Sequence, residues 1–238
     1  MDADRLLDWN GCWNARDLGG LPLAGGGLTR RRSLVRSDAL DGLSRAGWRA
    51  LSDYGVRTVI DLRNDDERTS DHARGPDSVT TLRLPLDAVE DREFWDHWER
   101  EPPPLFYGAH LERFPERSAA VVRAIARAEP GGVLFHCVGG RDRTGMISVL
   151  ALALAGVTAD AIAADHALSD ERLSPMYAAR GVPDQGEEIA TELAARGIGG
   201  AGTAIRAMLE GFDLEAVLRR GGLGEEDVGL LRARLRPS

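Results

Sequence analysis

The apolar residues of this chain fall into short β-rich runs separated by longer stretches with helical spacing. Residues 56–62 and 133–136 form mostly apolar runs of the length expected for buried strands. Residues 34–38 and the partly alternating run at 79–86 predict two further strands. Because strands alternate with helical segments along the chain, the pattern predicts an α/β fold with a central, mostly parallel sheet flanked by helices.

Helical spacing accounts for most of the remaining chain. Residues 44–54 are predicted to form a helix, with Ser44 as its N-cap and Gly55 just beyond its end. An amphipathic helix is predicted at 115–128 and a mostly apolar one at 146–155. Further helices are predicted at 90–101, 158–168, 223–235 and within 169–209, the last broken near 181–183 and 197–202. We expect residues 1–238 to form a single domain with a sizeable core.

The run at 133–136 leads into a stretch with the composition of a binding loop. The strand ends at Cys137, and five residues separate Cys137 from Arg143, near which a helix is predicted to begin. Gly139 and Gly140 allow the backbone to turn tightly and to approach a ligand closely. The helix N-terminus directs free N–H groups and the positive end of its dipole at the loop. This arrangement of strand, tight loop and helix predicts an anion-binding site.

Cys137 is expected at the bottom of this loop. The field that binds an anion also stabilises a thiolate, and a thiolate beneath a bound phosphate is an in-line nucleophile. Arg143 supplies a bidentate fork for phosphate oxygens. An inert buried cysteine is the alternative interpretation, and the string of a nucleotide P-loop does not occur. The expected phosphate ligands are the backbone amides of Val138, Gly139, Gly140, Arg141, Asp142 and Arg143, together with the Arg143 side chain.

Residues 136–145 resemble the signature loop of a known family. Cys, five residues, Arg and Thr are typical of cysteine-dependent phosphatases. The longer string is similar to the His-Cys-x-x-Gly-Lys-Asp-Arg-Thr-Gly loop of the bacterial atypical tyrosine and lipid phosphatases, with Arg141 in place of Lys. Residues 14–20 resemble that family's Asn-Phe-Arg-Asp-Leu-Gly-Gly motif, with Ala15 in place of the aromatic residue, and 61–63 its Asp-Leu-Arg motif. The resemblance implies a protein-tyrosine-phosphatase-like fold with a helical lid insertion.

The resemblance also implies roles for individual residues. Cys137 attacks phosphorus to form a phosphocysteine, which water then cleaves, while Arg143 stabilises the phosphate oxygens. Asp142 is the leading candidate for the general acid that protonates the leaving oxygen. Asp61 is the alternative, because the carboxyl end of its strand faces the same crevice. Thr144 is expected to donate its hydroxyl to Cys137.

Other polar residues near these motifs have an architectural interpretation. We expect His136 to orient the loop through its ring nitrogens and to transfer no proton. Arg16 and Asp17 are expected to bond local backbone, with direct substrate contact as the alternative. Cys12 is expected to be a small packed residue.

The predicted helix at 90–101 carries three large rings, Phe94, Trp95 and Trp98, on one face. It is either a lid over the phosphate site or an outer helix that packs its rings against the core. Packing is favoured, because aromatic residues at helical spacing usually belong to a core. An apolar wall for a phosphotyrosine ring is expected from this segment or from the helical region at 170–210.

The preferred function is that of a protein-tyrosine phosphatase, a hydrolase of phosphotyrosine with phosphoserine and phosphothreonine as further substrates. The alternative substrate is a phosphoinositide or another phosphorylated lipid or small molecule. Arg141 supplies one extra cation for such a substrate, but Val138 offers none where some lipid phosphatases have a second. A non-catalytic phosphate-binding module is the alternative of another class. The intact Cys137, Asp142 and Arg143 argue against it.

The composition of the chain limits the classes of molecule that the protein is expected to bind. The net charge of −8 and the pI near 5.2 speak against nucleic acid and anionic membranes. The longest mostly apolar run, at 146–155, is too short for stable membrane insertion, and the first residues lack a signal-peptide core. The histidines lack metal-ligand spacing, so we expect no metal and no other cofactor.

The two cysteines indicate the compartment. A disulfide between Cys12 and Cys137 would block the nucleophile, so we expect a reducing compartment, by default the cytoplasm. Export without a signal peptide would leave no mark in the sequence. No pattern in the chain indicates an oligomeric state.

Overall fold

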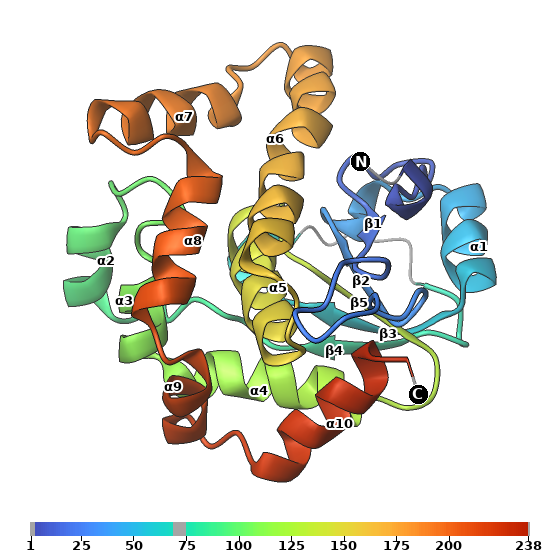
Figure 1. The fold of residues 1–238 in the computed structure, drawn as a ribbon. Helices are drawn as coiled ribbons and strands as arrows, with labels where there is room; N and C mark the ends of the chain where they lie inside the picture. The colour runs from blue at the N-terminus through green and yellow to red at the C-terminus, as the bar shows by residue number, and fades with distance from the viewer. Residues whose placement is uncertain (1–2, 69–74, 238) are drawn as a thin grey trace.

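The computed structural model describes residues 3–68 and 75–237, and Figure 1 traces the rest in grey. Five strands of the described residues form one sheet in the order β1–β2–β5–β3–β4. They are β1 (Arg16–Asp17), β2 (Leu34–Ser37), β3 (Val56–Asp61), β4 (Thr80–Arg83) and β5 (Gly132–His136). β1 is antiparallel to β2, and the other neighbouring pairs are parallel. The prediction of a mostly parallel central sheet is therefore confirmed.

The helices of the described residues cover this sheet. They are α1 (Arg45–Tyr54), α2 (Arg92–Trp98), α3 (Tyr107–Arg113), α4 (Pro115–Arg127), α5 (Asp142–Leu154), α6 (Ala159–Arg180), α7 (Gln185–Ala195), α8 (Ala201–Gly211), α9 (Leu214–Arg220) and α10 (Glu225–Leu235), with the short 3-10 turns η1 (Ala3–Arg5), η2 (Leu40–Gly42) and η3 (Asp65–Glu67). The predicted caps of α1 are confirmed: the Ser44 side chain accepts the N–H of Gly47, and Gly55 ends the helix at φ 106°.

Each face of the sheet has its own core, because side chains alternate along a strand. On β5, Val133 and Phe135 belong to the larger apolar cluster and Leu134 to the smaller one. The larger cluster includes residues of α3 to α6 and α8 to α10, whereas the smaller one includes Leu51 of α1 and the N-terminal Trp9. Figure 1 accordingly shows α1 apart from the other helices. The sheet is thus enclosed between two unequal layers.

The register places three strand ends side by side. Ser37 of β2 and Asp61 of β3 both lie opposite His136 of β5. Segments that leave the carboxyl ends of parallel strands meet at one edge of the sheet. The loop after His136 therefore lies between the segments that follow β2 and β3.

Several boundaries differ from the predictions. β4 is confined to Thr80–Arg83, and the predicted helices at 158–168 and beyond join into the single helix α6, which contains Pro175. The next glycine, Gly181, ends α6 at φ 63°. α3 and α9 were not predicted, because seven residues carry too little periodicity to be recognised.

The aromatic face of α2 packs inward. The Phe94 ring lies 5.0 Å from the ring of Trp95 and 5.0 Å from that of Phe114, between ring centroids, and Trp98 stacks on Phe94 at 6.3 Å. None of these rings lines the cavity described below. The packing interpretation is confirmed, and α2 does not form a lid over that cavity.

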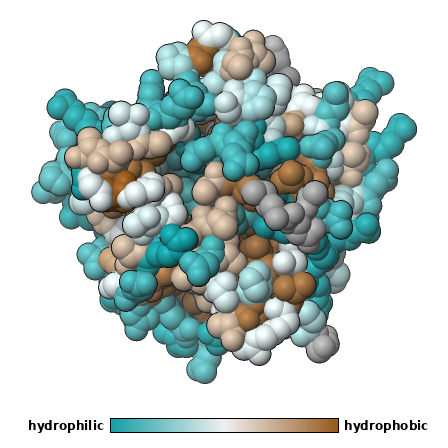
Figure 2. All heavy atoms as spheres, turned by 45° about the horizontal axis from the view of Figure 1, so that its top comes forward, coloured by the Kyte–Doolittle hydropathy of each residue, from teal (hydrophilic) through white to brown (hydrophobic). Residues whose placement is uncertain are grey.

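α6 extends beyond the sheet, α7 crosses near its far end, and α8 returns along α6 (Figure 1). Figure 2 brings this upper part forward and shows hydrophobic residues reaching the surface between hydrophilic ones. Among the helices of residues 3–68 and 75–237, none combines the length and the apolarity needed to cross a bilayer.

Candidate active site

Cys137 lies at the edge of the sheet where β5 ends, and its side chain is almost fully buried, with 3% of its surface exposed. It lines a cavity of about 600 Å³, together with the loop that follows it. Trp13, the segment 38–42, Glu67 and the second half of α6 form the other walls. Segments distant in the sequence therefore converge on the predicted nucleophile.

The carbonyl groups of residues 138–140 are all engaged by donors from outside the loop. In chain order they accept hydrogen bonds from the N–H of Ala39 (2.8 Å), the side-chain amide of Asn14 (3.0 Å) and the guanidinium of Arg36 (2.8 Å). A trans peptide unit is planar, so its N–H points opposite to its C=O. The donors to the carbonyl groups of Gly139 and Gly140, Asn14 and Arg36, do not line the cavity, so the N–H groups of the same peptide units, on Gly140 and Arg141, are directed toward it, as in an anion nest.

The two glycines of the loop differ in what they contribute. Gly140 has φ 69°, and a Cβ built there would lie 2.3 Å from the carbonyl oxygen of Ser37. A side chain is therefore excluded at Gly140 both by the backbone conformation and by the neighbouring strand. A Cβ on Gly139 would meet only Leu173, at an ordinary contact distance of 3.8 Å.

A buried cluster of charged side chains supports the loop at residues 138–140 on the side that faces α6 and β2. Asp165 of α6 pairs with Arg5, with Nε of Arg16 (3.2 Å) and with Nη1 of Arg36 (3.0 Å). Burial by itself raises the pKa of Asp165, but the three guanidinium groups hold it well below its usual value. Because Arg36 also donates to the carbonyl of Gly140, the cluster fixes the loop to β2 and α6 at once.

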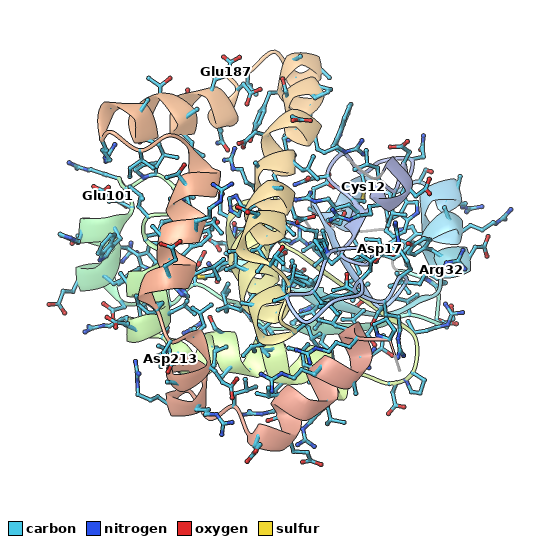
Figure 3. The ribbon with its side chains drawn as sticks, viewed as in Figure 1. Cys12, Asp17, Arg32, Glu101, Glu187 and Asp213 are labelled. Atoms are coloured by element: carbon cyan, nitrogen blue, oxygen red, sulfur yellow. The ribbon has the colours of Figure 1, made fainter. Side chains whose placement is uncertain are left out.

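Asp17 of the 14–20 motif bonds nearby backbone as predicted, whereas Arg16 bonds mainly Asp165 and Ser169 of α6. Arg16 is completely buried and does not line the cavity. Asp17 accepts hydrogen bonds from the N–H groups of Gly19 (2.8 Å) and Arg32 (2.8 Å), and Figure 3 labels Asp17 and Arg32 near each other on the side of α1. These bonds fix the backbone after β1 and before β2, where the N-terminal segment joins the sheet.

The guanidinium of Arg143 is enclosed by carboxylates. Glu67 binds both Nη atoms, with 2.5 Å between Nη2 and Oε1, and Asp87 Oδ2 lies 3.4 Å from Nε. Burial acts to lower the pKa of Arg143, but the ion pair with Glu67 and the proximity of Cys137 and Asp87 raise it above its usual value. Arg143 is therefore permanently charged, and its fork already holds oxygen anions of the kind a phosphate presents.

Asp142 also lines the cavity, with 36% of its side chain exposed. Its Oδ1 accepts a hydrogen bond from Nε of Arg141 (3.1 Å). Nη2 of Arg141 donates to Gln185 Oε1 (3.1 Å), which also accepts the Tyr177 hydroxyl (2.9 Å). The guanidinium of Arg141 thus connects Asp142 to α6 and α7. Arg141 Nη1, in contrast, has no hydrogen-bond partner among the described residues, so the extra cation expected for a lipid headgroup is only partly engaged.

Asp61 does not reach the cavity. Nε and Nη2 of Arg63 each donate to its carboxylate at 2.9 Å. Burial acts to raise the pKa of Asp61, but the bonds from Arg63 and the proximity of His136 lower it. A carboxyl group that is held ionised is a poor proton donor.

His136 has the orienting role predicted for it. Its Nδ1 lies 3.0 Å from the carbonyl oxygen of Cys137 and therefore carries the hydrogen, because a carbonyl only accepts. Burial lowers the pKa of His136, so the ring is neutral near pH 7. The bond expected from Thr144 to Cys137 is not made: Thr144 Oγ1 is buried and has no hydrogen-bond partner among the described residues.

Sequence reasoning missed Glu67, Asp87 and Trp13. Glu67 and Asp87 each follow a strand at the carboxyl edge of the sheet, which is the signal that might have identified them. The expected apolar wall is formed by Leu173, Met176 and Tyr177 of α6, inside the predicted 170–210 region. The described residues contain no group of His, Cys, Asp and Glu that would hold a metal.

A sequence model of the tyrosine phosphatase family matches residues 7–236. The chain belongs to the tyrosine phosphatase family. This family member is 32% identical over 166 residues to a protein of Cupriavidus necator provisionally named a tyrosine-protein phosphatase, covering 67% of this chain and 61% of the relative.

Two other relatives of this family member have related names. A tyrosine-protein phosphatase of Nostoc commune is 34% identical over 141 residues, and the match covers 58% of this chain and 48% of the relative. The triple specificity protein phosphatase PtpB of Mycobacterium tuberculosis is 28% identical over 200 residues, and the match covers 71% of this chain and 70% of the relative. The matched part of the chain thus spans less than two thirds of the length of the first two relatives, 61% and 48%.

Proposed function

We propose that this protein is a cysteine-dependent phosphatase that hydrolyses phosphotyrosine. The observation that carries the proposal is the convergence of the Cys137 side chain, the inward N–H groups of Gly140 and Arg141, and Arg143 on one cavity. These groups provide a nucleophile, a set of oxyanion donors and a fixed cation, which together are what phosphoryl transfer through a thiol requires.

The reaction proceeds in two displacements. The Cys137 thiolate attacks phosphorus, a P–S bond forms, and the P–O bond to the leaving group breaks as Asp142 protonates the leaving oxygen. Water then attacks the phosphocysteine, its proton passes to the Asp142 carboxylate, and the P–S bond breaks to give inorganic phosphate. The loop amides and Arg143 stabilise the equatorial oxygens in both steps. Asp61, ionised and outside the cavity, has no part in this scheme.

Phosphotyrosine is the favoured substrate because of the walls above the loop. Leu173, Met176 and Tyr177 present an apolar surface beside Trp13, which is suited to an aromatic ring. Phosphoserine and phosphothreonine would reach the same loop with fewer contacts. The name of the PtpB relative, a triple specificity protein phosphatase, supports a specificity broader than phosphotyrosine alone. The lipid alternative remains the second candidate, with Arg141 as its one extra cation beside the loop.

The whole chain acts, in this proposal, as one phosphatase domain in a reducing compartment, the cytoplasm. Both cysteines are free. Burial and the nearby Asp38 raise the pKa of Cys12 far above its usual range, so this thiol is poorly reactive.

The deciding experiment measures phosphate release from phosphotyrosine, phosphoserine and phosphoinositide, with a metal chelator present, in wild type, Cys137→Ser and Cys12→Ser. We expect wild type and Cys12→Ser to hydrolyse phosphotyrosine best and Cys137→Ser to lose roughly a thousandfold or more of the rate. Preference for the lipid would preserve the mechanism and change the substrate. If the protein binds a phosphotyrosine peptide but releases no phosphate from it, the protein is a phosphate-binding module and not an enzyme.

A further inference from the structure

A second cavity lies at the opposite end of the strands that carry the phosphate loop. Its volume is about 670 Å³, close to that of the Cys137 cavity. Its walls come from residues 30–33 before β2, residues 130–131 before β5, the end of α4 and the last turns of α10. Figure 1 shows α4 and α10 side by side below the sheet. β5 is five residues long, so at about 3.3 Å per residue the two cavities lie on the order of 15 Å apart. They are therefore separate sites.

Positive charge dominates the lining of this second cavity. Its described lining residues include no aspartate or glutamate, although acidic residues outnumber basic ones by 38 to 30 in the whole chain. The Cys137 cavity, in contrast, is lined by side chains of both signs. A hollow lined by one sign of charge raises the local concentration of ions of the opposite sign. We call it the arginine cavity, after the five arginines that line it: Arg30, Arg31, Arg32, Arg127 and Arg234.

Two of these arginines are held by partners that do not line the cavity. Arg127 pairs with Glu226 (2.6 Å) and Asp227 (2.5 Å) of α10. Nη2 of Arg30 donates to the carbonyl oxygen of Arg236 at 2.9 Å. Side chains that are already ordered lose less conformational entropy when a ligand binds. The two carboxylates also offset the charge of Arg127, so the net positive charge of the cavity rests on the other arginines.

Arg234 is a cation without a counter-charge among the described residues. Its Nη1 donates to the carbonyl oxygen of Gly131 (2.9 Å), and its Nη2 donates to that of Ala128. Its Nε is buried and has no hydrogen-bond partner within the described structure. Burial without a nearby carboxylate lowers the pKa of Arg234 below its usual value. An anion in the cavity would supply the counter-charge that the described residues do not provide.

The backbone of Arg32 gives an independent indication of a binding site. Its φ is 60°, and no other residue except glycine has a positive φ in the part of the chain that the structure describes. This conformation is strained for a residue with a Cβ, and such strain is concentrated at functional sites. The guanidinium of Arg32 lies 5.2 Å from the centroid of the Tyr54 ring and forms no ion pair with a described residue. Its charge is therefore available to a ligand.

We propose that the arginine cavity is a second ligand site, which binds a small polyanion away from the phosphate loop. Its volume falls in the range of small-molecule sites. Guanidinium groups bind the oxygens of phosphates and of carboxylates through the same N–H forks. A triphosphate and a tricarboxylate therefore share the chemistry that this site recognises. The proposal needs no bond to form or break, and it does not depend on the proposed phosphatase activity.

The test is isothermal titration calorimetry of the full chain, as Cys137→Ser to prevent turnover, with tripolyphosphate and with citrate. We expect two binding events for tripolyphosphate, one at the phosphate loop and one at the arginine cavity. Arg32→Asn should weaken the second event by about tenfold or more, because a charge-assisted contact is lost. Asparagine tolerates the left-handed conformation, so the melting temperature should change by less than about 4 °C.

Two further variants separate this site from the phosphate loop and from general attraction of anions. Arg143→Gln should weaken only the event at the phosphate loop. Arg220→Gln is the matched control, because it removes the same charge from an exposed side chain at the end of α9. It should leave both binding events unchanged.

The two probes distinguish the sources of the polyanion, and binding of either one that depends on Arg32 supports the proposal. Tight binding of tripolyphosphate with weak binding of citrate would assign the site to a phosphorylated ligand, and the reverse would assign it to a polycarboxylate. A single event that is lost in Arg143→Gln would overturn the proposal, as would equal weakening by Arg32→Asn and Arg220→Gln. Because binding is measured without turnover, these outcomes are independent of whether the wild type releases phosphate.

Discussion

Gly139 and Gly140 are neighbours in the loop, yet only one of them is required by the backbone. From the sequence, both glycines were expected to serve the tight turn. The structure assigns the positive φ and the contact with Ser37 to Gly140 alone. Sequence does not distinguish them, because the difference depends on how closely β2 approaches the loop.

We predict that Gly140→Ala destabilises the protein by roughly 2–4 kcal/mol and abolishes activity. The strained left-handed conformation contributes about 1–2 kcal/mol, and the overlap with Ser37 forces a backbone shift of similar cost. Chemical denaturation and phosphate release measure the two effects. Gly139→Ala is the matched control and should lose less than about 1 kcal/mol. Equal destabilisation by both variants would refute this account of the loop.

The site was predictable at the residue scale only where chemistry and spacing coincide. Cys137, Arg143 and Asp142 were identified from a continuous string, and the structure brings all three to one cavity. Glu67 and Asp87 come from two other segments, and an acidic residue after a strand has no distinguishing spacing. Their proximity to Arg143 is a product of the sheet register.

At the scale of elements, α6 is attached to the sheet by charge as well as by apolar contact. Asp165 lies on α6, whereas Arg16 and Arg36 lie on β1 and β2. The sequence predicted the helix and the strand at 34–38, and it predicted Arg16 as architectural. It did not predict their partner, because a buried ion pair between distant elements leaves no local pattern.

We predict that Asp165→Asn lowers the free energy of unfolding by about 3–5 kcal/mol, since it leaves several buried guanidinium groups without their counter-charge. Thermal or urea denaturation measures the loss. Asp160→Asn, on the same helix, is the control. Its carboxylate is 84% exposed and pairs with Arg206, so the change should stay within about 0.5 kcal/mol. Similar values for the two variants would show that the buried cluster contributes little stability.

The caps and the central strands were the most predictable elements. Ser44 and Gly55 bound α1 as expected, and β3 and β5 coincide with the continuous apolar runs. The two-residue β1 and the short α3 and α9 depend on tertiary contacts and were not predicted. Local propensity determines an element only where the element is long enough to express a period.

On the scale of the whole molecule, stability is expected to be unevenly distributed. α5 has ten buried residues, whereas α7 buries only Gly186 and Leu193. Polar contacts hold α7 at its two ends: Gln185 with Arg141, and the adjoining Arg196 with Glu101 (3.3 Å). Figure 3 shows Glu101 below α7, on the side of α2.

We predict that backbone amides of α7 exchange with solvent on the order of 100-fold faster than those of α5, because exchange follows local opening where few apolar contacts are lost. Hydrogen exchange followed by mass spectrometry resolves the two helices. Leu193→Ala should accelerate exchange in α7 further and leave α5 unchanged. Uniform protection across both helices would mean that α7 opens only when the whole protein unfolds.

In the proposed function, the ion pair between Glu67 and Arg143 has a consequence for turnover. Because a carboxylate already occupies the Nη atoms, entry of a phosphate ester is an exchange of one anion for another at a cation that is never bare. The same exchange operates in reverse once inorganic phosphate has formed, since Glu67 competes for the guanidinium and assists departure of the product. In the proposed function, Glu67 would therefore lower the affinity of Arg143 for substrate and product together, which favours the departure of phosphate at the end of each cycle.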